Sequence, residues 1–177
     1  MPPRACLCAL LVLALAGCGA QADARYAAAL RLWQSRPLAH YTLHTREIVG
    51  GRPCAQIVEV RDERLVRVLN NTCQHPNLWT ISWLFTFVAK SSAPPDRCAQ
   101  VDPSGGCVCR DAVDLQVEYD PTYGYPSTIV ARQTWRADWQ SMGYWWYSVR
   151  HLALASCASP FTDPGRRVVV REVKPLP

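Results

Sequence analysis

The sequence predicts one α+β domain, in which about five or six strands form a single antiparallel sheet with two helices packed on it. Of the 177 residues, 49% are hydrophobic and 19% are charged, which fits one globular domain and excludes collagen-like, low-complexity and multi-pass membrane proteins. Helical spacing and strand-like alternation follow one another in the order helix, strands, helix, strands. Because no repeat or linker interrupts residues 26–154, we expect a single domain there.

The N-terminus has the pattern of an export signal. One basic residue, Arg4, precedes an apolar run from Ala5 to Ala16 that is too short to span a bilayer. The run leads into Leu15-Ala16-Gly17-Cys18, which resembles the lipobox of bacterial lipoproteins. This resemblance implies a signal peptide over residues 1–17, lipid such as palmitate on Cys18, and a tether over residues 18–25.

Two locations outside the cytoplasm follow from alternative processing of this signal. Lipid on Cys18 would anchor the protein in the bacterial cell envelope, and several acyl chains would hold it firmly. Cleavage after Ala20-Gln21-Ala22, which is a small-residue site, would instead release a secreted soluble form.

The cysteines fit an oxidising compartment. Nine are present, of which the signal peptide removes two and lipidation uses one, so six remain to pair. Fifteen pairings are possible in principle. A hairpin of residues 54–61 and 64–70 would place Cys54 opposite Asn71 and near Cys73, and a bridge there would contribute about 3 kcal/mol. The disulfide candidates are Cys54, Cys73, Cys98, Cys107, Cys109 and Cys157.

The first half of the domain predicts a helix, a strand and a hairpin. Asp23 is the expected N-cap of a helix that ends before Arg36-Pro37, because the residue before proline avoids helical geometry. Residues 40–49 are rich in β-branched and aromatic side chains and alternate in polarity, which predicts a strand. Gly50-Gly51 then supplies a turn into the hairpin that Asp62-Glu63 closes.

A second helix and a loop follow. The apolar residues Ile81, Leu84, Phe85 and Val88 have helical spacing, and Thr80 is the expected N-cap. Residues 91–110 lose all periodicity and contain three cysteines, so we expect a long cysteine-rich loop held by disulfides. Strands are then predicted over 113–119, 127–135 and 144–154. Residues 155–177 contain four prolines and are expected to form a C-terminal tail packed on the domain.

The turn between the strands at 113–119 and 127–135 carries the most distinctive motif. The run Val117–Pro126 reads VEYDPTYGYP and resembles the hallmark of a bacterial family of small exported proteins and lipoproteins, known only as a domain of unknown function. The resemblance covers about residues 26–154 and implies an envelope location and an α+β fold, but no activity. The chain departs from the family pattern in residues 91–110 and in the tail. The motif residues are Tyr119, Asp120, Pro121, Tyr123, Gly124, Tyr125 and Pro126.

Reactive side chains form no strong constellation, so we expect no metal, cofactor or catalytic residue. His40 and His44 on a strand would lie about 13 Å apart, too far to share a metal. A zinc site from three cysteines and His75 competes with disulfides, which export favours. A calcium site also lacks its loop pattern. The calcium candidates are Asp111, Asp114, Glu118 and Asp120.

An aromatic segment is the best candidate for ligand binding. Four side chains could stack on a sugar ring or a flat apolar partner, with core packing as the alternative: Trp139, Tyr144, Trp145 and Tyr147. The net charge of +5 comes from scattered residues, so we expect no nucleic-acid partner.

Two functions remain open. The leading hypothesis is a non-catalytic, lipid-anchored envelope module that binds a protein or a cell-wall polymer. The alternative is a carbohydrate-binding domain or hydrolase directed at the cell wall, with Asp120, Asp138 or Glu118 as acid and base.

Overall fold

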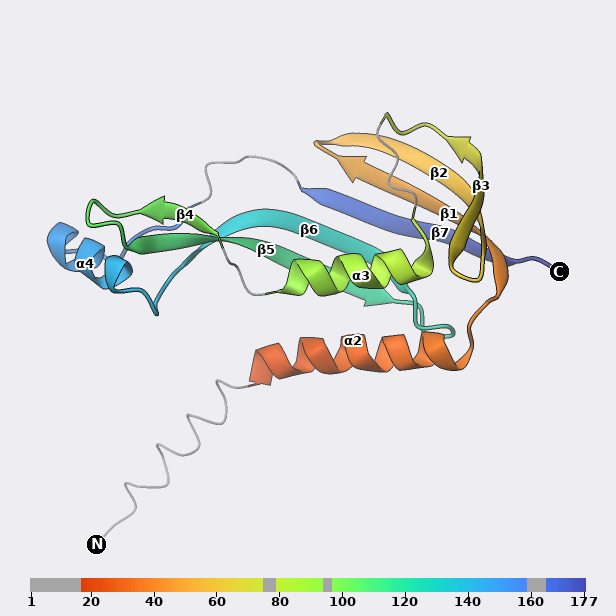
Figure 1. Ribbon diagram of the computed structural model, residues 1–177, viewed down its shortest axis with the longest axis horizontal. Coiled ribbons are helices and arrows are strands. Elements are labelled where there is room, and N and C mark those ends of the chain that lie inside the picture. Colours follow the sequence, from red (N-terminus) through yellow and green to blue (C-terminus); the bar gives the residue numbers. More distant parts are fainter. Residues whose placement is uncertain (1–16, 75–78, 94–96, 159–164) are drawn as a thin grey trace, which may run out of the picture. The chain divides into compact units, whose positions relative to one another are not determined.

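The computed structural model describes residues 17–74, 79–93, 97–158 and 165–177, with side chains from Ala24 onward (Figure 1). Most of the predicted signal peptide, together with Cys6, Cys8 and His75, lies outside the described residues, and the side chain of Cys18 is not described. The described chain divides into two compact units, one containing residues up to Pro37 together with Tyr119–Tyr125, and one containing the rest.

One antiparallel sheet of seven strands confirms the α+β class, with three helices in the described part of the chain. The strand order across the sheet is β3-β2-β1-β7-β6-β5-β4. The strand and helix numbers both exceed the prediction. The elements are α2 (Gly17–Ser35), β1 (His40–Val49), β2 (Arg52–Arg61), β3 (Arg64–Asn71), α3 (Ile81–Ser92), β4 (Cys98–Val101), β5 (Cys107–Tyr119), β6 (Pro126–Ala137), α4 (Met142–His151) and β7 (Arg166–Pro175).

The hairpin of β2 and β3 forms where the sequence predicted it. Asp62 and Glu63 have φ values of 48° and 58°, the left-handed geometry of a type I′ turn. Two irregularities in the pairing then shift the register, so that Gln56 rather than Cys54 faces Asn71. Each shift adds one residue on the β3 side, which brings Cys73 to the level of Cys54.

The main core lies between the sheet and α3. Tyr41 and Leu43 of β1 are fully buried, as are Val58 and Val60 of β2. The predicted apolar stripe of α3 is buried too, and Thr80 is its N-cap, accepting a 3.2 Å hydrogen bond from the Trp83 N–H. The hydroxyl of Tyr41 accepts a 3.2 Å bond from the Ile81 N–H, which fastens the start of α3 to β1.

Three predicted segments need correction. Residues 91–110 are not one loop, because they contain β4 and the start of β5, which pair as a hairpin. Residues 144–154 do not form a strand, since α4 covers most of them. The predicted tail, 155–177, contains β7, which lies in the interior of the sheet between β1 and β6.

The N-terminal helix also extends further than predicted. Residues 18–25, expected as a tether, belong to α2, and Asp23 lies inside this helix rather than at its N-cap. The helix ends at Ser35, as predicted from the following Arg36-Pro37 pair. None of the helices described is both long and apolar enough to cross a bilayer.

Candidate binding surface

All six predicted cysteines form disulfides. The bridges are Cys54–Cys73, Cys98–Cys107 and Cys109–Cys157. The first is the pair that the hairpin geometry predicted, and the other two lie around the β4–β5 hairpin and α4. Because every one of these sulfurs is in a bridge, none is a thiolate that could bind zinc.

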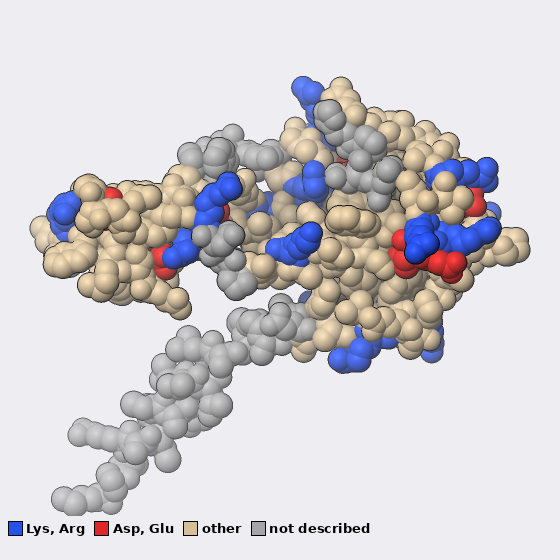
Figure 2. Space-filling model, viewed as in Figure 1, with Lys and Arg blue, Asp and Glu red and all other residues tan. Residues whose placement is uncertain are grey.

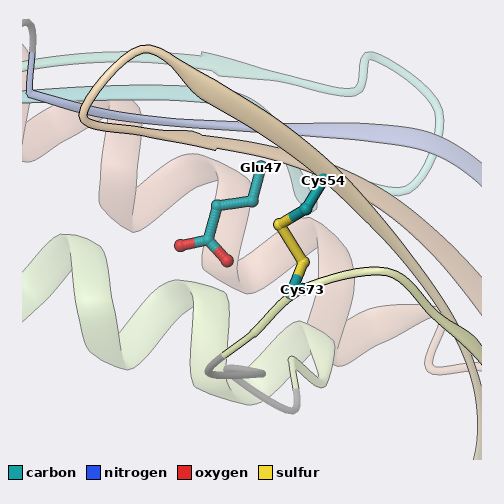
Figure 3. Close-up of side chains that lie close together, drawn as sticks. All are labelled: Glu47, Cys54 and Cys73. Carbon is teal, nitrogen blue, oxygen red and sulfur yellow. A yellow bond between two sulfur atoms is a disulfide. The ribbon is translucent and has the colours of Figure 1, made fainter.

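Glu47 lies beside the Cys54–Cys73 bridge, as Figure 3 shows. Its carboxylate and the two sulfurs lie within 4.8 Å of one another, the one such group of three potential ligands among the described residues. The carboxylate is buried, yet Arg166 Nε lies 2.9 Å from its Oε1 and Trp79 Nε1 donates to its Oε2 at 3.4 Å. With a bridged pair of sulfurs and a carboxylate already paired, the group is a structural polar cluster and not a metal centre.

The two histidines of β1 remain on an extended strand. His40 Nε2 lies 2.8 Å from Glu59 Oε1, and Arg67 Nε donates to Glu59 Oε2 at 2.6 Å. These hydrogen bonds, that of His40 foremost, hold the pKa of Glu59 below its usual range. His40 therefore belongs to a hydrogen-bonded cluster with Glu59 and Arg67, and an extended strand keeps His44 too far along it to share a metal.

The proposed acid and base residues are occupied or isolated. Asp138 is buried and accepts a 2.7 Å bond from Arg110 Nε. Glu118 lines an open groove of about 380 Å³ on the sheet. It is the one carboxylate among the groove's described lining residues, so the groove lacks the second carboxylate that glycoside hydrolysis requires. The lining residues are Ile48, Gln116, Glu118, Thr128, Val130, Arg132, Gly165 and Arg167.

The VEYDPTYGYP motif builds a turn that packs on α2 within the first unit. Asp120 Oδ1 accepts hydrogen bonds from the N–H groups of Thr122 at 2.9 Å and Tyr123 at 2.7 Å. Gly124 has φ 83°, and a Cβ there would lie 2.3 Å from the Ala29 carbonyl oxygen. Only glycine therefore fits at position 124, where the turn approaches the helix closely, and Asp120 fixes the turn itself.

Two tyrosines of the motif are partly buried in this unit. The Tyr125 ring meets Trp33 of α2 edge to face, with centroids 6.4 Å apart. Burial raises the pKa of both Tyr119 and Tyr125 to about 12. The raised pKa values reflect the removal of both phenols from water, as expected for packing residues.

The predicted aromatic residues separate into core and surface. Tyr144 is fully buried in a small core with Val108 and Cys109. Tyr147 is half-buried and packs against the ring of His151 at 4.3 Å between centroids. Trp139 and Trp145 are exposed, with their rings 6.1 Å apart.

The outer side of α4 carries an exposed apolar stripe that the strand prediction missed. Met142, Trp145, Trp146 and Val149 have the spacing of one helix face, and all four are exposed. We call this stripe, with the exposed residues Trp139 before it and Leu152 and Leu154 after it, the α4 face. In Figure 2, tan atoms cover most of the α4 end on the side in view. The missed signal was helical spacing in a segment rich in strand-favouring aromatics.

Several contacts hold α4 rigidly in place. Ser141 caps its N-terminus by accepting a 3.1 Å bond from the Gly143 N–H. Gly143 touches Gly106 so closely that a Cβ on it would lie 2.4 Å from the Gly106 backbone. Leu152 ends the helix in left-handed geometry, and the Cys109–Cys157 bridge then ties the following segment to β5.

The turn beneath α4 is fixed by Asp102. Its Oδ1 accepts a 2.7 Å bond from the Gly106 N–H, and the Ser104 hydroxyl donates to its carboxylate at 2.8 Å. These bonds, that of the Ser104 hydroxyl foremost, hold the pKa of Asp102 below its usual range. A charged carboxylate therefore braces the turn on which α4 rests.

No protein-family model matches the chain, and neither the curated proteins nor the solved structures contain a significant match to it.

Proposed function

We propose that the protein is a non-catalytic binding module of the bacterial cell envelope, anchored by lipid on Cys18, that contacts its partner through the α4 face. The observation that carries this proposal is an apolar helix face that is exposed although its helix is held by a cap, a close backbone contact and a disulfide. The exposed parts of a stripe of two tryptophans, a methionine and a valine gain no burial in the fold while they face water. A partner that covers it would gain the free energy of burying it.

The disulfides support the envelope location. All six cysteines that follow Cys18 are paired, which favours an oxidising compartment such as the bacterial periplasm or cell surface. Together with the lipobox-like Leu15-Ala16-Gly17-Cys18, they favour an exported chain with a lipid on its N-terminal cysteine.

The polar side chains support binding rather than catalysis. The carboxylates of Glu47, Glu59, Asp102 and Asp138 are held by hydrogen bonds or ion pairs that serve the fold. A hydrolase would instead aim two carboxylates at one cleft. Among its described lining residues, the groove offers Glu118 as its one carboxylate.

Intact mass of the membrane-extracted protein tests the location and the anchor. We expect an N-terminal Cys18 with acyl chains, and a gain of six hydrogens on reduction of the three bridges. A Cys18→Ser chain should lose the acyl mass and keep the bridges. Free thiols in the isolated protein would contradict export, and a mature chain that begins at Asp23 without lipid would contradict the anchor.

Radical footprinting tests whether the α4 face is covered in the envelope. Trp145 and Trp146 are 46% and 57% exposed, and Trp83 on α3 is a matched control at 54%. Hydroxyl-radical labelling of intact envelopes should modify Trp145 and Trp146 several-fold less than in the purified protein, while Trp83 changes little. Equal labelling of Trp145 and Trp146 in the two samples would refute the binding role.

A cell-wall polymer is the second candidate partner for this face, since the exposed Trp139 and Trp145 rings could stack on sugars. Sedimentation with purified peptidoglycan tests it. Binding that Trp139→Ala abolishes and Trp83→Ala preserves would favour the polymer.

A further inference from the structure

We propose that the α4 face inserts into the headgroup region of an anionic lipid bilayer and thereby gives the protein a second membrane contact besides its lipid anchor. The inference rests on the proposed function, in which this face is the binding surface, and it adds the chemical identity of the partner.

The face has the arrangement of an interfacial helix. The residues that α4 turns inward are Gly143, Tyr144 and Ser148, whereas its apolar stripe points away from the protein. A helix of a soluble domain normally does the reverse. Amphipathic helices that lie in a membrane surface bury such a stripe at the boundary between headgroups and acyl chains.

The side chains on the face suit that boundary. Tryptophan is enriched at the membrane interface because its ring is apolar and its N–H needs a partner. The Trp145 Nε1 already donates a 3.0 Å bond to the Trp139 carbonyl, so this indole can leave water without losing a hydrogen bond. Apolar exposure continues past the helix, where Leu152 is 94% exposed.

The charge around the face is complementary to anionic lipid. Residues 139–158 contain no Asp or Glu, and the exposed Arg150 and His151 lie in the last turn of α4. Two carboxylates near this segment in the described part of the chain are withdrawn, since Asp138 is buried against Arg110 and Asp102 is buried in its turn. Basic residues beside an apolar helix face add electrostatic attraction to anionic headgroups.

The form of the surface favours a bilayer over a protein. The side chains of the α4 face are 46% to 94% exposed, so they project from the helix as a ridge, and a protein partner would need a groove of matching shape. A bilayer is deformable and accommodates a ridge without such a match. Because the Gly106–Gly143 contact and the Cys109–Cys157 bridge already fix α4, insertion requires little ordering of the protein.

Quenching by brominated lipid in proteoliposomes tests the inference on the full, membrane-extracted chain. Vesicles of phosphatidylcholine, with and without phosphatidylglycerol, carry bromine on their acyl chains. We expect tryptophan quenching that is at least twofold stronger with phosphatidylglycerol. Trp145→Phe/Trp146→Phe should remove most of it, whereas the matched control Trp83→Phe should retain it.

Two further variants test whether binding depends on the apolar stripe and on the positive charge beside it. Val149→Asp places a charge on an exposed position, so it should reduce quenching strongly without affecting the fold. Arg150→Glu should reduce quenching in the phosphatidylglycerol vesicles and change it little in phosphatidylcholine alone. An unchanged mass shift on reduction confirms that each variant keeps its three bridges.

Flotation of the same vesicles distinguishes the lipid anchor on Cys18 from the insertion of the α4 face. A chain that floats with the vesicles through its lipid but shows no bromolipid quenching at Trp145 and Trp146 would overturn this inference and leave the anchor intact. Shielding of these tryptophans from aqueous acrylamide without bromolipid quenching would also overturn it, because a protein or polymer would then cover the face. A chain without lipid that still shows the quenching would support it and remove the anchor.

Discussion

The helices α3 and α4 carry the same apolar pattern and use it in opposite ways. Ile81, Leu84, Phe85 and Val88 of α3 have the spacing that Met142, Trp145, Trp146 and Val149 repeat in α4. The first set is buried under α3, and the second faces water. Both helices have a serine or threonine N-cap, so the difference does not come from how each helix begins.

The two helices differ in the size of the apolar surface that the sheet presents to them. At the α3 end, β1 and β2 present a broad buried surface of large side chains. At the α4 end, the narrow β4–β5 hairpin supports a core centred on Val108, Cys109 and Tyr144. Two of the three disulfides lie at the α4 end. Covalent bridges therefore supplement a small apolar core there, and the stripe of α4 stays exposed.

Removal of the Cys109–Cys157 bridge, at the α4 end, should lower the stability of the protein more than any other change proposed here. Because the bridge spans 48 positions, Cys109→Ala/Cys157→Ala should lower the free energy of unfolding by about 4 kcal/mol. The Cys98–Cys107 bridge spans only 9 positions, so its removal should cost about 2.5 kcal/mol. Urea unfolding monitored by tryptophan fluorescence measures both. Equal losses would show that loop length does not set the contribution of these bridges.

Truncation of one residue in each stripe should separate a core residue from a surface residue. Leu84→Ala should cost about 3 kcal/mol, because it leaves a cavity under α3. Val149→Ala should change stability by less than about 0.5 kcal/mol, because its side chain is exposed. Thermal unfolding of the two variants provides the comparison. A large loss from Val149→Ala would mean that the α4 face is part of the core.

A methyl group at the contact beneath α4 should have a smaller effect. Gly143→Ala places a Cβ against the Gly106 backbone and should cost about 2 kcal/mol. Gly50→Ala is the control, because Gly50 has open space but φ 56°, and its left-handed geometry should cost about 1 kcal/mol. Denaturant midpoints rank the two variants. The reverse order would show that the turn at residues 102–106 yields easily.

The smallest expected effect is that of acid. A low pH should reduce the stability of both ends of the sheet, because each end has a carboxylate with a lowered pKa. Asp102 at the α4 end and Glu59 at the other end titrate below their usual ranges when folded. Each therefore stabilises the fold fully above the usual carboxyl pKa of about 4, and this stabilisation is lost as the pH falls through the lower folded pKa.

Replacing each carboxylate by its amide shows which of the two is responsible for the loss of stability in acid. Asp102→Asn should flatten the pH dependence of tryptophan fluorescence from the α4 end, and Glu59→Gln should leave that signal unchanged. Fluorescence titration from pH 7 to pH 2 provides the test. An identical acid response in the Asp102→Asn variant would rule out Asp102 as the source.

Local signals in the sequence predicted the α3 end well. The bounds of β1, the cap at Thr80 and the stripe of α3 follow from propensity and spacing within a short window. The Cys54–Cys73 bridge could be predicted because a two-residue turn sets the register of its hairpin. The two register shifts were not foreseen, since they depend on packing across β2 and β3.

The α4 end and the middle of the sheet depend on distant residues. Aromatic side chains around Trp145 favour a strand by propensity, but the Ser141 cap and the contact with Gly106 favour a helix. β7 pairs with β1 across more than a hundred residues of chain, a relation that no local pattern reports. The α4 face was therefore recognised in part, through Trp139 and Trp145, and its helical continuation was missed.

The position of β7 sets the order in which the protein can be completed. It is the seventh strand in sequence, yet it joins β1 to β6 in the middle of the sheet. During synthesis, the other six strands emerge as two groups that lack the strand between them. The finished sheet can therefore form only after residues 166–175 have emerged, so the two groups stay unjoined until the last strand is made.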